Sequence, residues 1–254
     1  MKVTPRSPQQ VQALQKLREL ILAGEFAVGQ RVSELAVVDK LDISRTPVRL
    51  ALTILEHEGF LRTLPRGGFT VRQFTIQDVH DAIEIRGFLE GMAARRAAER
   101  RPSDEELEPL REVTRKLDGI IELEDRTVLV ERYMELNAEF HRLLLGLSDS
   151  AMLRRSFGHV SSLPFAGPNA FAFTGGDSKE HIELLRFGQF QHADILDAIE
   201  KGQGLRAEAL GREHAQLALK IFSRALSRIN LLERIPGASL LDLGDQTSSK
   251  GQGD

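Results

Sequence analysis

Apolar residues in the N-terminal part of the chain recur at helical spacing and predict three helices. The first is predicted over residues 9–23 and ends at a glycine. Its buried face is made of Val11, Leu14, Leu17 and Ile21. A short second helix is predicted over residues 33–40 and a third over residues 44–58. Ser44 is of the residue type that caps a helix by accepting a free backbone amide, and Pro47 is tolerated in the first turn because its missing N–H costs little there.

Two short strand-like segments follow the third predicted helix, over residues 60–63 and 69–72. The intervening Leu-Pro-Arg-Gly-Gly over residues 64–68 is a strong turn signal. Three helices followed by a hairpin are the layout of a winged helix-turn-helix. We therefore predict a DNA-binding domain of this class over residues 1–72, followed by a linker over residues 73–76.

The pattern beyond residue 76 is helical throughout. The predicted helices cover residues 76–100, 103–123, 127–146, 149–162, 178–201 and 204–228. Ser103 and Glu106 have the spacing of a capping box at the start of one of them. Residues 231–254 become polar and glycine-rich and are expected to form a flexible tail. The predicted fold class is mainly α, with the winged helix-turn-helix joined to an all-α helical bundle over residues 77–230.

The amino-acid composition indicates which cellular compartment and which kinds of site to expect. The chain has no cysteine, which excludes disulfides, thiolate metal sites and cysteine nucleophiles. It shows neither a signal peptide nor an apolar run of the roughly 20 residues that a membrane helix needs. We expect a cytoplasmic protein with no membrane partner. Residues 1–72 carry 11 Lys and Arg against 7 Asp and Glu, whereas residues 73–254 carry 23 against 30, so only the first part is suited to a polyanion.

The start of the third predicted helix carries the candidate DNA-reading residues. The N-terminal end of a recognition helix reaches base edges in the major groove. Arg45 and Arg49 are four residues apart and share one helical face, where a guanidinium group can hold guanine or phosphate. Ser44 and Thr46 can donate hydrogen bonds to phosphates. At the tip of the predicted hairpin, Arg66 with the adjacent Gly67 could reach the neighbouring groove or backbone.

Residues 11–72 resemble the DNA-binding domain of the GntR family of regulators. The resemblance rests on Ile21, Gly24, Gly29, Glu34, Ser-Arg-Thr-Pro-Val-Arg at 44–49, Ala51-Leu52, Leu55, Glu58-Gly59 and Arg66-Gly67-Gly68-Phe69. It implies that Arg45, Arg49 and Arg66 contact an operator. The chain departs from the family at Leu35, where some members have a DNA-contacting arginine, and at Asp42, where a glycine is usual.

Histidines are the candidate chemistry of the helical part. His192 and His214 each lie 11 residues from Gln203, so a helical hairpin that turns there would bring both imidazoles to the same height. Asn137 and His141, four residues apart, share a face of another predicted helix. Three imidazoles and an amide oxygen suit a divalent transition metal. Spacing alone leaves open the alternative of unconnected histidines.

Residues 76–228 resemble the FCD ligand-binding domain of the FadR branch of the same family. The resemblance rests on Asp81, Ile83-Glu84-Ile85-Arg86, Leu89-Glu90, Ala93-Ala94, Asn137, Phe140-His141, His192, Ile195, Ala198-Ile199 and His214. It implies a metal site formed by Asn137, His141, His192 and His214, with zinc as the expected ion and nickel or manganese as alternatives. Asparagine in place of the more usual aspartate removes a negative charge, which should weaken metal binding.

The resemblance also implies a small-molecule effector. Family effectors are often small carboxylates held beside a buried arginine, and Arg86 is the candidate here, although a salt bridge to Glu90 one helical turn away is an equal alternative. The pattern around Arg86 further resembles the vanillate-responsive branch, which indicates a cyclic acid. Phe165, Phe171 and Phe173 could line the pocket, with plain packing as the simpler interpretation.

The sequence therefore predicts a homodimeric, operator-binding transcription regulator, a repressor that effector binding releases, and not an enzyme. Two alternatives stay open. A metal-dependent hydrolase would use the same three histidines, although no His-Glu-x-x-His motif accompanies them. A metal-free regulator would bind an acyl ligand or another bulky ligand instead.

Overall fold

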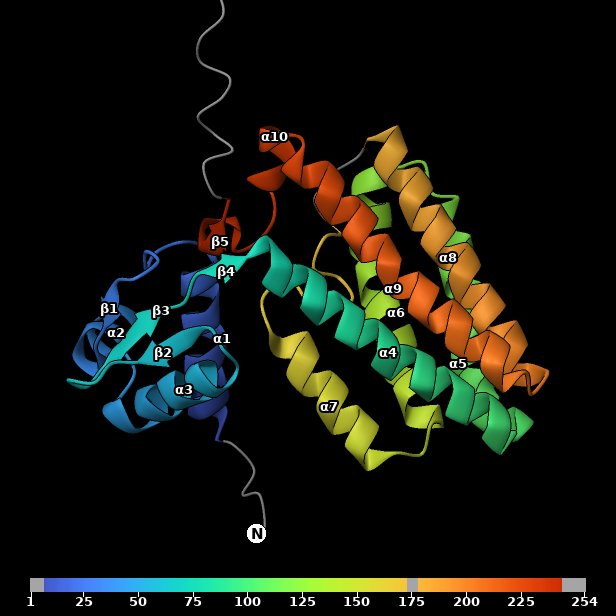
Figure 1. Cartoon of the computed structure of the whole chain (residues 1–254), viewed down its shortest axis with the longest axis horizontal. Coiled ribbons are helices and arrows are strands. Elements are labelled where there is room, and N and C mark those ends of the chain that lie inside the picture. Colours follow the sequence, from blue (N-terminus) through green and yellow to red (C-terminus); the bar gives the residue numbers. More distant parts are fainter. Residues whose placement is uncertain (1–6, 173–177, 244–254) are drawn as a thin grey trace, which may run out of the picture. The chain divides into compact units, whose positions relative to one another are not determined.

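The computed structural model describes residues 7–172 and 178–243. The chain divides into two compact units, one made of residues up to Asp78 together with residues from Pro236 onward, and one made of Val79 to Ile235. Figure 1 shows the elements of each unit. Phe173, a candidate for a pocket wall, lies outside the described residues.

The first unit contains the predicted three helices and hairpin. The helices are α1 (Pro8–Leu22), α2 (Glu34–Leu41) and α3 (Arg45–His57), and the strands are β1 (Arg31–Val32), β2 (Leu61–Thr63) and β3 (Phe69–Val71). The strands form an antiparallel sheet in the order β1-β3-β2, with Arg62 opposite Thr70. The winged helix-turn-helix prediction is confirmed. Strand β1 was not predicted, because two residues are too few to show alternation.

The core of this unit follows the helical spacing of the sequence. Leu17 and Ile21 of α1 are fully buried together with Leu52 and Leu55 of α3, and Phe60 closes the core next to β2. The predicted buried face of α1 is therefore largely correct, although Val11 is 39% exposed.

A C-terminal segment belongs to the first unit and corrects two expected boundaries. Strand β4 (Phe74–Thr75) lies inside the predicted linker, and it pairs in parallel with β5 (Leu241–Asp242), which lies inside the predicted flexible tail. A short 3₁₀ helix over Ala238–Leu240 precedes β5. Leu240 and Leu241 are buried, and this apolar burial explains why residues 236–242 are folded. The tail residues beyond 243 lie outside the described part.

The second unit is helical, as predicted. Its helices are α4 (Ile76–Arg100, whose first three residues belong to the first unit), α5 (Asp104–Ile121), α6 (Arg126–Leu147), α7 (Ala151–Ser162), α8 (Lys179–Glu200), α9 (Gly204–Leu226) and α10 (Ile229–Leu232). The predicted capping box is present, since the Ser103 hydroxyl accepts from the Glu106 amide while the Glu106 side chain accepts from the Ser103 amide. Within the described residues, no helix has both the length and the apolar character to cross a membrane.

Glycines bring α4 and α9 unusually close. A Cβ on Gly211 of α9 would lie 2.9 Å from the Cα of Gly91 on α4, and a Cβ on Gly87 would lie 2.8 Å from the Cβ of Ala215. The two backbones therefore approach where only glycine fits. This approach brings Arg86 and Glu90 of α4 close enough to the buried His214 of α9 to act on its charge.

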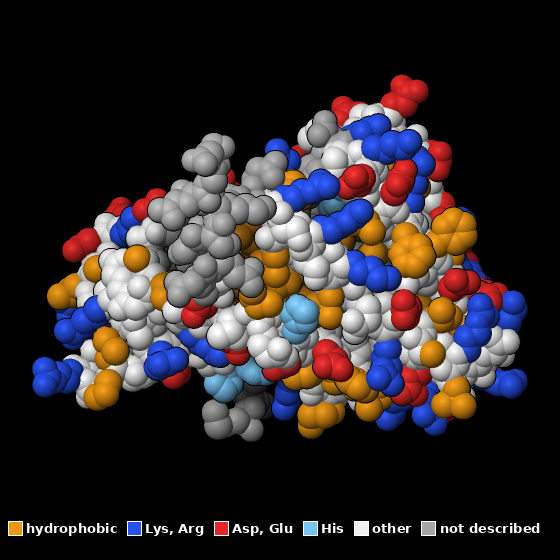
Figure 2. All heavy atoms as spheres, turned by 45° about the horizontal axis from the view of Figure 1, so that its top comes forward, with side chains coloured by type: hydrophobic (Ala, Val, Ile, Leu, Met, Phe, Trp, Pro, Cys, Tyr) orange, Lys and Arg blue, Asp and Glu red, His pale blue; other side chains and the backbone are white. Residues whose placement is uncertain are grey.

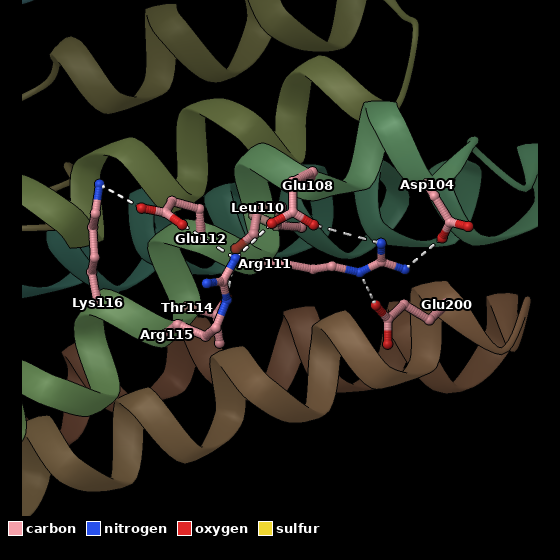
Figure 3. Close-up of polar contacts among 9 residues, drawn as sticks. All are labelled: Asp104, Glu108, Leu110, Arg111, Glu112, Thr114, Arg115, Lys116 and Glu200. Atoms are coloured by element: carbon pink, nitrogen blue, oxygen red, sulfur yellow. Dashed lines mark hydrogen bonds and ion pairs between the residues drawn. The ribbon is translucent and has the colours of Figure 1, made fainter.

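Ion pairs cover the outer face of α5. Arg111 is held by Asp104 at 2.9 Å on the same helix and by Glu200 at 2.6 Å near the end of α8, as Figure 3 shows. Glu112 likewise pairs with Lys116 at 3.0 Å. Exposed pairs of this kind contribute little stability, so we interpret this face as a solvated surface.

Candidate functional site

The N-terminal turn of α3 presents the predicted DNA-reading side chains to solvent. Arg45, Thr46 and Arg49 are exposed, while Pro47 in the same turn is buried. Ser44 occupies the N-cap position, but its hydroxyl makes no capping hydrogen bond, which corrects the expected capping role. The exposed Ser44 hydroxyl is therefore available to an external acceptor such as a phosphate.

Arg49 is held in place by the neighbouring helix. Its Nε lies 2.8 Å from Oε1 of Glu34 on α2, and its Nη2 lies 3.1 Å from Oε2 of the same carboxylate. The hydrogen bonds from Arg49 lower the pKa of Glu34. The Arg49 side chain is still 67% exposed, so the two-pronged pair orients the guanidinium group without burying it.

The turn between α2 and α3 explains one departure from the family pattern. Asp42 ends α2 in the left-handed conformation, with φ 52° and ψ 45°. Glycine is the usual residue in this conformation, and aspartate is among the few others that tolerate it. Asp42 therefore keeps the same turn at a modest conformational cost.

The tip of the hairpin between β2 and β3 is exposed, as expected for a wing. Arg66 and Gly67 are both exposed, and Gly67 and Gly68 have φ of 80° and 85°. Arg31 of β1 was not among the predicted residues, yet its Nη2 donates to the Gly67 carbonyl at 3.1 Å and ties the wing to the sheet. Its role depends on the unpredicted strand β1.

The second unit brings three predicted histidines together. His141 on α6, His192 on α8 and His214 on α9 each offer a ring nitrogen, and these atoms lie within 4.8 Å of one another. All three side chains are buried. Nε2 of His192 and Nε2 of His214 are only 3.0 Å apart, as the symmetry about Gln203 predicted.

Two glutamines on α8 determine which nitrogens of these rings carry the proton. Nδ1 of His192 lies 3.1 Å from Oε1 of Gln189, and Nδ1 of His214 lies 3.1 Å from Oε1 of Gln191. The orientation of Gln189 is set on its other side, because its Nε2 donates to the Thr114 carbonyl at 3.1 Å and to Asp118 at 2.8 Å. An amide oxygen only accepts, so each Nδ1 is the N–H donor and each Nε2 of a neutral ring keeps its lone pair.

Burial keeps the imidazole rings of His192 and His214 neutral. Burial, followed by the neighbouring His214 and His141, holds the pKa of His192 well below its usual range. Burial, followed by His141, lowers the pKa of His214 to about 3, against the opposing attraction of Glu90. The two neutral Nε2 lone pairs therefore face each other at 3.0 Å, an arrangement that a cation between them would stabilise.

Glu90 on α4 completes the charged surroundings of His141. Its Oε1 lies 2.9 Å from Nδ1 of His141 and 3.7 Å from Nε of Arg86. Burial raises the pKa of Glu90, but His141 and Arg86 outweigh it and bring the pKa down to about 2. The i to i+4 spacing predicted Glu90 only as a partner of Arg86 and carried no signal of the contact with His141.

Asn137 faces the same region. Its Nδ2 donates to Oδ1 of Asn169 at 2.7 Å, which leaves Oδ1 of Asn137 as the free end of the amide. That oxygen is buried and has no hydrogen-bond partner among the described residues. The Nδ2 of Asn169 in turn donates to the Met134 carbonyl at 2.8 Å, so the loop residue fixes the amide orientation.

A small cavity of about 40 Å³ opens beside the histidines. Its lining residues are Arg86, Tyr133, Asn137, His141, Pro168, Phe171, Ala172, Leu185, His214, Leu217, Ala218 and Ile221. Nη1 of Arg86 donates to the Ala166 carbonyl at 3.2 Å, and burial raises the pKa of Tyr133, which keeps its hydroxyl protonated. Phe171 lines the cavity, whereas Phe165 is buried without lining it.

The donor set fits a divalent transition metal. Three imidazoles, of which those of His192 and His214 are neutral and offer Nε2 lone pairs, with an orphaned amide oxygen nearby, match the ligands and number that zinc prefers. Two ligand nitrogens at 3.0 Å are close to the roughly 3.3 Å expected for tetrahedral ligands about 2.05 Å from zinc. The buried histidine triad could therefore hold a metal ion, and the residues do not identify which one.

Comparison with known proteins gives the class of the chain. The model of the bacterial regulatory proteins of the gntR family matches residues 9–71, and the FCD domain model matches residues 81–217. The chain belongs to the GntR family of transcription regulators and carries an FCD domain. It has the same two-part organisation that the sequence predicted.

Relatives agree with this class. The chain is 35% identical over 136 residues, 54% of its own length and 62% of the relative's, to the Nta operon transcriptional regulator of Aminobacter aminovorans. It is 26% identical over 221 residues, 84% of its length and 89% of the relative's, to the transcriptional repressor RspR of Escherichia coli. The solved structure of McbR/YncC from E. coli has a TM-score of 0.63 at 21% identity, covering 86% of this chain and 99% of that one, and shares its fold.

Proposed function

We propose that this regulator binds operator DNA through the start of α3 and the wing, and that a small anion bound beside a metal in the helical unit modulates that binding. The observation that carries the proposal is the buried histidine triad, with its lone pairs turned inward beside the cavity that Arg86 lines. Within the GntR class, this site supplies a place for an effector.

The proposed DNA-reading residues are Ser44, Arg45, Thr46, Arg49, Arg66 and Gly67. They are exposed, and they lie at the helix start and wing tip that reach DNA in winged helix proteins. Fluorescence anisotropy with DNA from upstream of the protein's own gene tests the set. Arg45→Ala should weaken binding at least tenfold, whereas Arg155→Ala, which changes an exposed arginine of α7, should not. Equal affinities would contradict the assignment.

The proposed metal ligands are His141, His192, His214 and Asn137, with zinc as the first candidate and nickel or manganese as alternatives. The inward Nε2 lone pairs and the orphaned Asn137 Oδ1 support the set. A metal held this way supplies a Lewis acid with coordination positions for a ligand oxygen. Metal analysis of protein purified without nickel resin tests which ion is retained.

The proposed effector is a small carboxylate that contacts Arg86. The cavity contains one buried guanidinium group and the Tyr133 hydroxyl, and apolar residues form much of its remaining wall. Its volume of about 40 Å³ favours a compact anion over a bulky acyl ligand. Calorimetric titration with short-chain and aromatic carboxylates tests this, and Arg86→Met should abolish the heat of binding. Turnover of simple esters, lost in His192→Ala, would instead revive the hydrolase alternative.

A homodimer and repression complete the proposal. Exposed apolar side chains flank α9 on both sides, with Phe88 on α4 under the Arg212 guanidinium group at 4.1 Å and Phe187 on α8 under Lys220 at 5.6 Å. Figure 2 shows exposed apolar side chains among charged ones over this part of the helical unit. Such patches favour association. Light scattering tests the dimer, and transcription with and without carboxylate tests repression.

A further inference from the structure

We propose that Glu90 is the positioning residue that supplies the negative charge of the metal site, acting through His141 and taking the place of the charge that Asn137 does not provide. The inference rests on the metal site of the proposed function. It gives Glu90 a role beyond the ion pair with Arg86 that the sequence suggested.

The position of Glu90 is that of an outer partner and not of a ligand. Its Oε1 lies 2.9 Å from Nδ1 of His141, so it contacts one of the ligand rings. Among the described residues, the converging nitrogen group contains the three histidines and does not contain Glu90. A metal-bound imidazole commonly donates its other N–H to a carboxylate, which fixes the ring orientation and makes the ligand more basic.

The three histidines have outer partners of unequal charge. Nδ1 of His192 and Nδ1 of His214 face the neutral amides of Gln189 and Gln191, at 3.1 Å each. Only the partner of His141 is a carboxylate. The inner ligand set would be neutral as well, because an asparagine carries no charge and a histidine binds a metal as the neutral ring. A divalent cation inside the protein needs a nearby negative charge, and Glu90, only 1% exposed, is placed to supply it.

Arg86 makes this charge part of effector recognition. Its Nε lies 3.7 Å from Oε1 of Glu90, so without metal the buried guanidinium group and the carboxylate compensate each other. With a divalent ion bound, Glu90 would face positive charge from both Arg86 and the metal-bound His141 ring, and the site as a whole would carry a net charge of about two positive units. An anion that enters the cavity would then meet this net positive charge beside Arg86. Metal binding is therefore expected to precede anion binding.

Metal affinity in five variants tests the charge role. Zinc and cobalt affinities are measured by competition with a chromophoric chelator on the full chain. We expect Glu90→Gln to lower affinity about 10- to 100-fold while the cobalt absorption bands keep their position, because the inner ligands are unchanged. Glu90→Asp should recover part of the loss. Asn137→Asp should raise affinity and, combined with Glu90→Gln, restore it. Glu99→Gln, on the exposed part of α4, is the matched control and should leave affinity unchanged.

The outcomes separate this inference from the metal site itself. Unchanged affinity in Glu90→Gln, or no compensation by Asn137→Asp, overturns the role of Glu90 while leaving the site intact. A shift of the cobalt bands in Glu90→Gln also overturns it, because Glu90 would then be a direct ligand. A wild-type chain that binds neither ion overturns the proposed site and the inference together. Circular dichroism of each metal-free variant checks folding, and Asn137→Asp alone still tests the charge argument if Glu90→Gln does not fold.

Discussion

His192 and His214 lie on different helices, yet their Nε2 atoms are 3.0 Å apart and both Nδ1 atoms are held by glutamine oxygens. This relationship defines the chemistry of the helical unit. Two neutral rings with fixed protonation direct two lone pairs at one point, and His141 completes the triad. A hydrophobic core alone would not require that arrangement.

Acid should destabilise the metal-free protein through these rings. The folded-state pKa of His214, about 3, is below the ordinary 6.5, so the unfolded state binds the proton first. Stability is therefore fully present above pH 6.5 and is lost as the pH falls toward 3, by up to about 1.4 kcal/mol per pH unit for each such ring. The lowered pKa of Glu90 acts in the same direction, because its contribution to the free energy of unfolding is lost as the pH falls from 4.5 to about 2. Urea unfolding with a chelator at pH 7, 6 and 5 measures the slope.

The contribution of His214 to this pH dependence can be separated from that of His192 by substitution. His214→Gln should reduce the slope between pH 6.5 and 5, because that ring no longer takes up a proton on unfolding. A wild-type stability that does not change over this range would contradict the neutral, buried state of the rings.

Arg49→Ala should affect DNA binding far more than folding. The pair with Glu34 is exposed and screened by solvent, so its loss should change the free energy of unfolding little. Loss of a base or phosphate contact should cost about 1–3 kcal/mol of DNA binding. Chemical denaturation and anisotropy titration measure the two quantities. A large stability loss with unchanged DNA affinity would make Arg49 a structural residue.

Asp42→Gly should stabilise the first unit slightly. Asp42 has φ 52°, a conformation that glycine adopts without steric cost, and we expect a gain of up to about 1 kcal/mol. Asp42→Val should destabilise, because a β-branched residue is strongly disfavoured at positive φ. Thermal unfolding compares the three proteins, and an unstable glycine variant would show that the Asp42 side chain has a role that the turn does not require.

Removal of residues 236–254 should loosen the first unit. Leu240 and Leu241 are buried in it, and the Gly237 amide donates to the Leu22 carbonyl of α1 at 3.0 Å. We expect a loss of about 2–4 kcal/mol from the two buried leucines together with the β4–β5 pairing. Hydrogen exchange in α1 and β4 measures it. A chain ending at Leu243 keeps β5 and serves as the control, and equal protection in both would contradict a structural role for the segment.

The sequence predicted what periodicity and symmetry determine. The helices of both units have strong 3.6-residue patterns, and the meeting of His192 and His214 follows from their equal distance to the turn. Glu90, Gln189 and Gln191 could not be predicted, because their roles depend on which way each side chain points between packed helices. The burial of Leu240 and Leu241 was also missed, because a long-range strand pairing leaves no local signal.

Metal content tests the central claim most directly. The protein is purified without chelator or nickel resin and dialysed against buffered zinc. The wild-type chain should then retain one ion per chain. The His192→Gln variant should retain none, while its circular dichroism remains that of a helical protein. A wild-type protein that holds no stoichiometric metal under these conditions would contradict the account of the histidine triad.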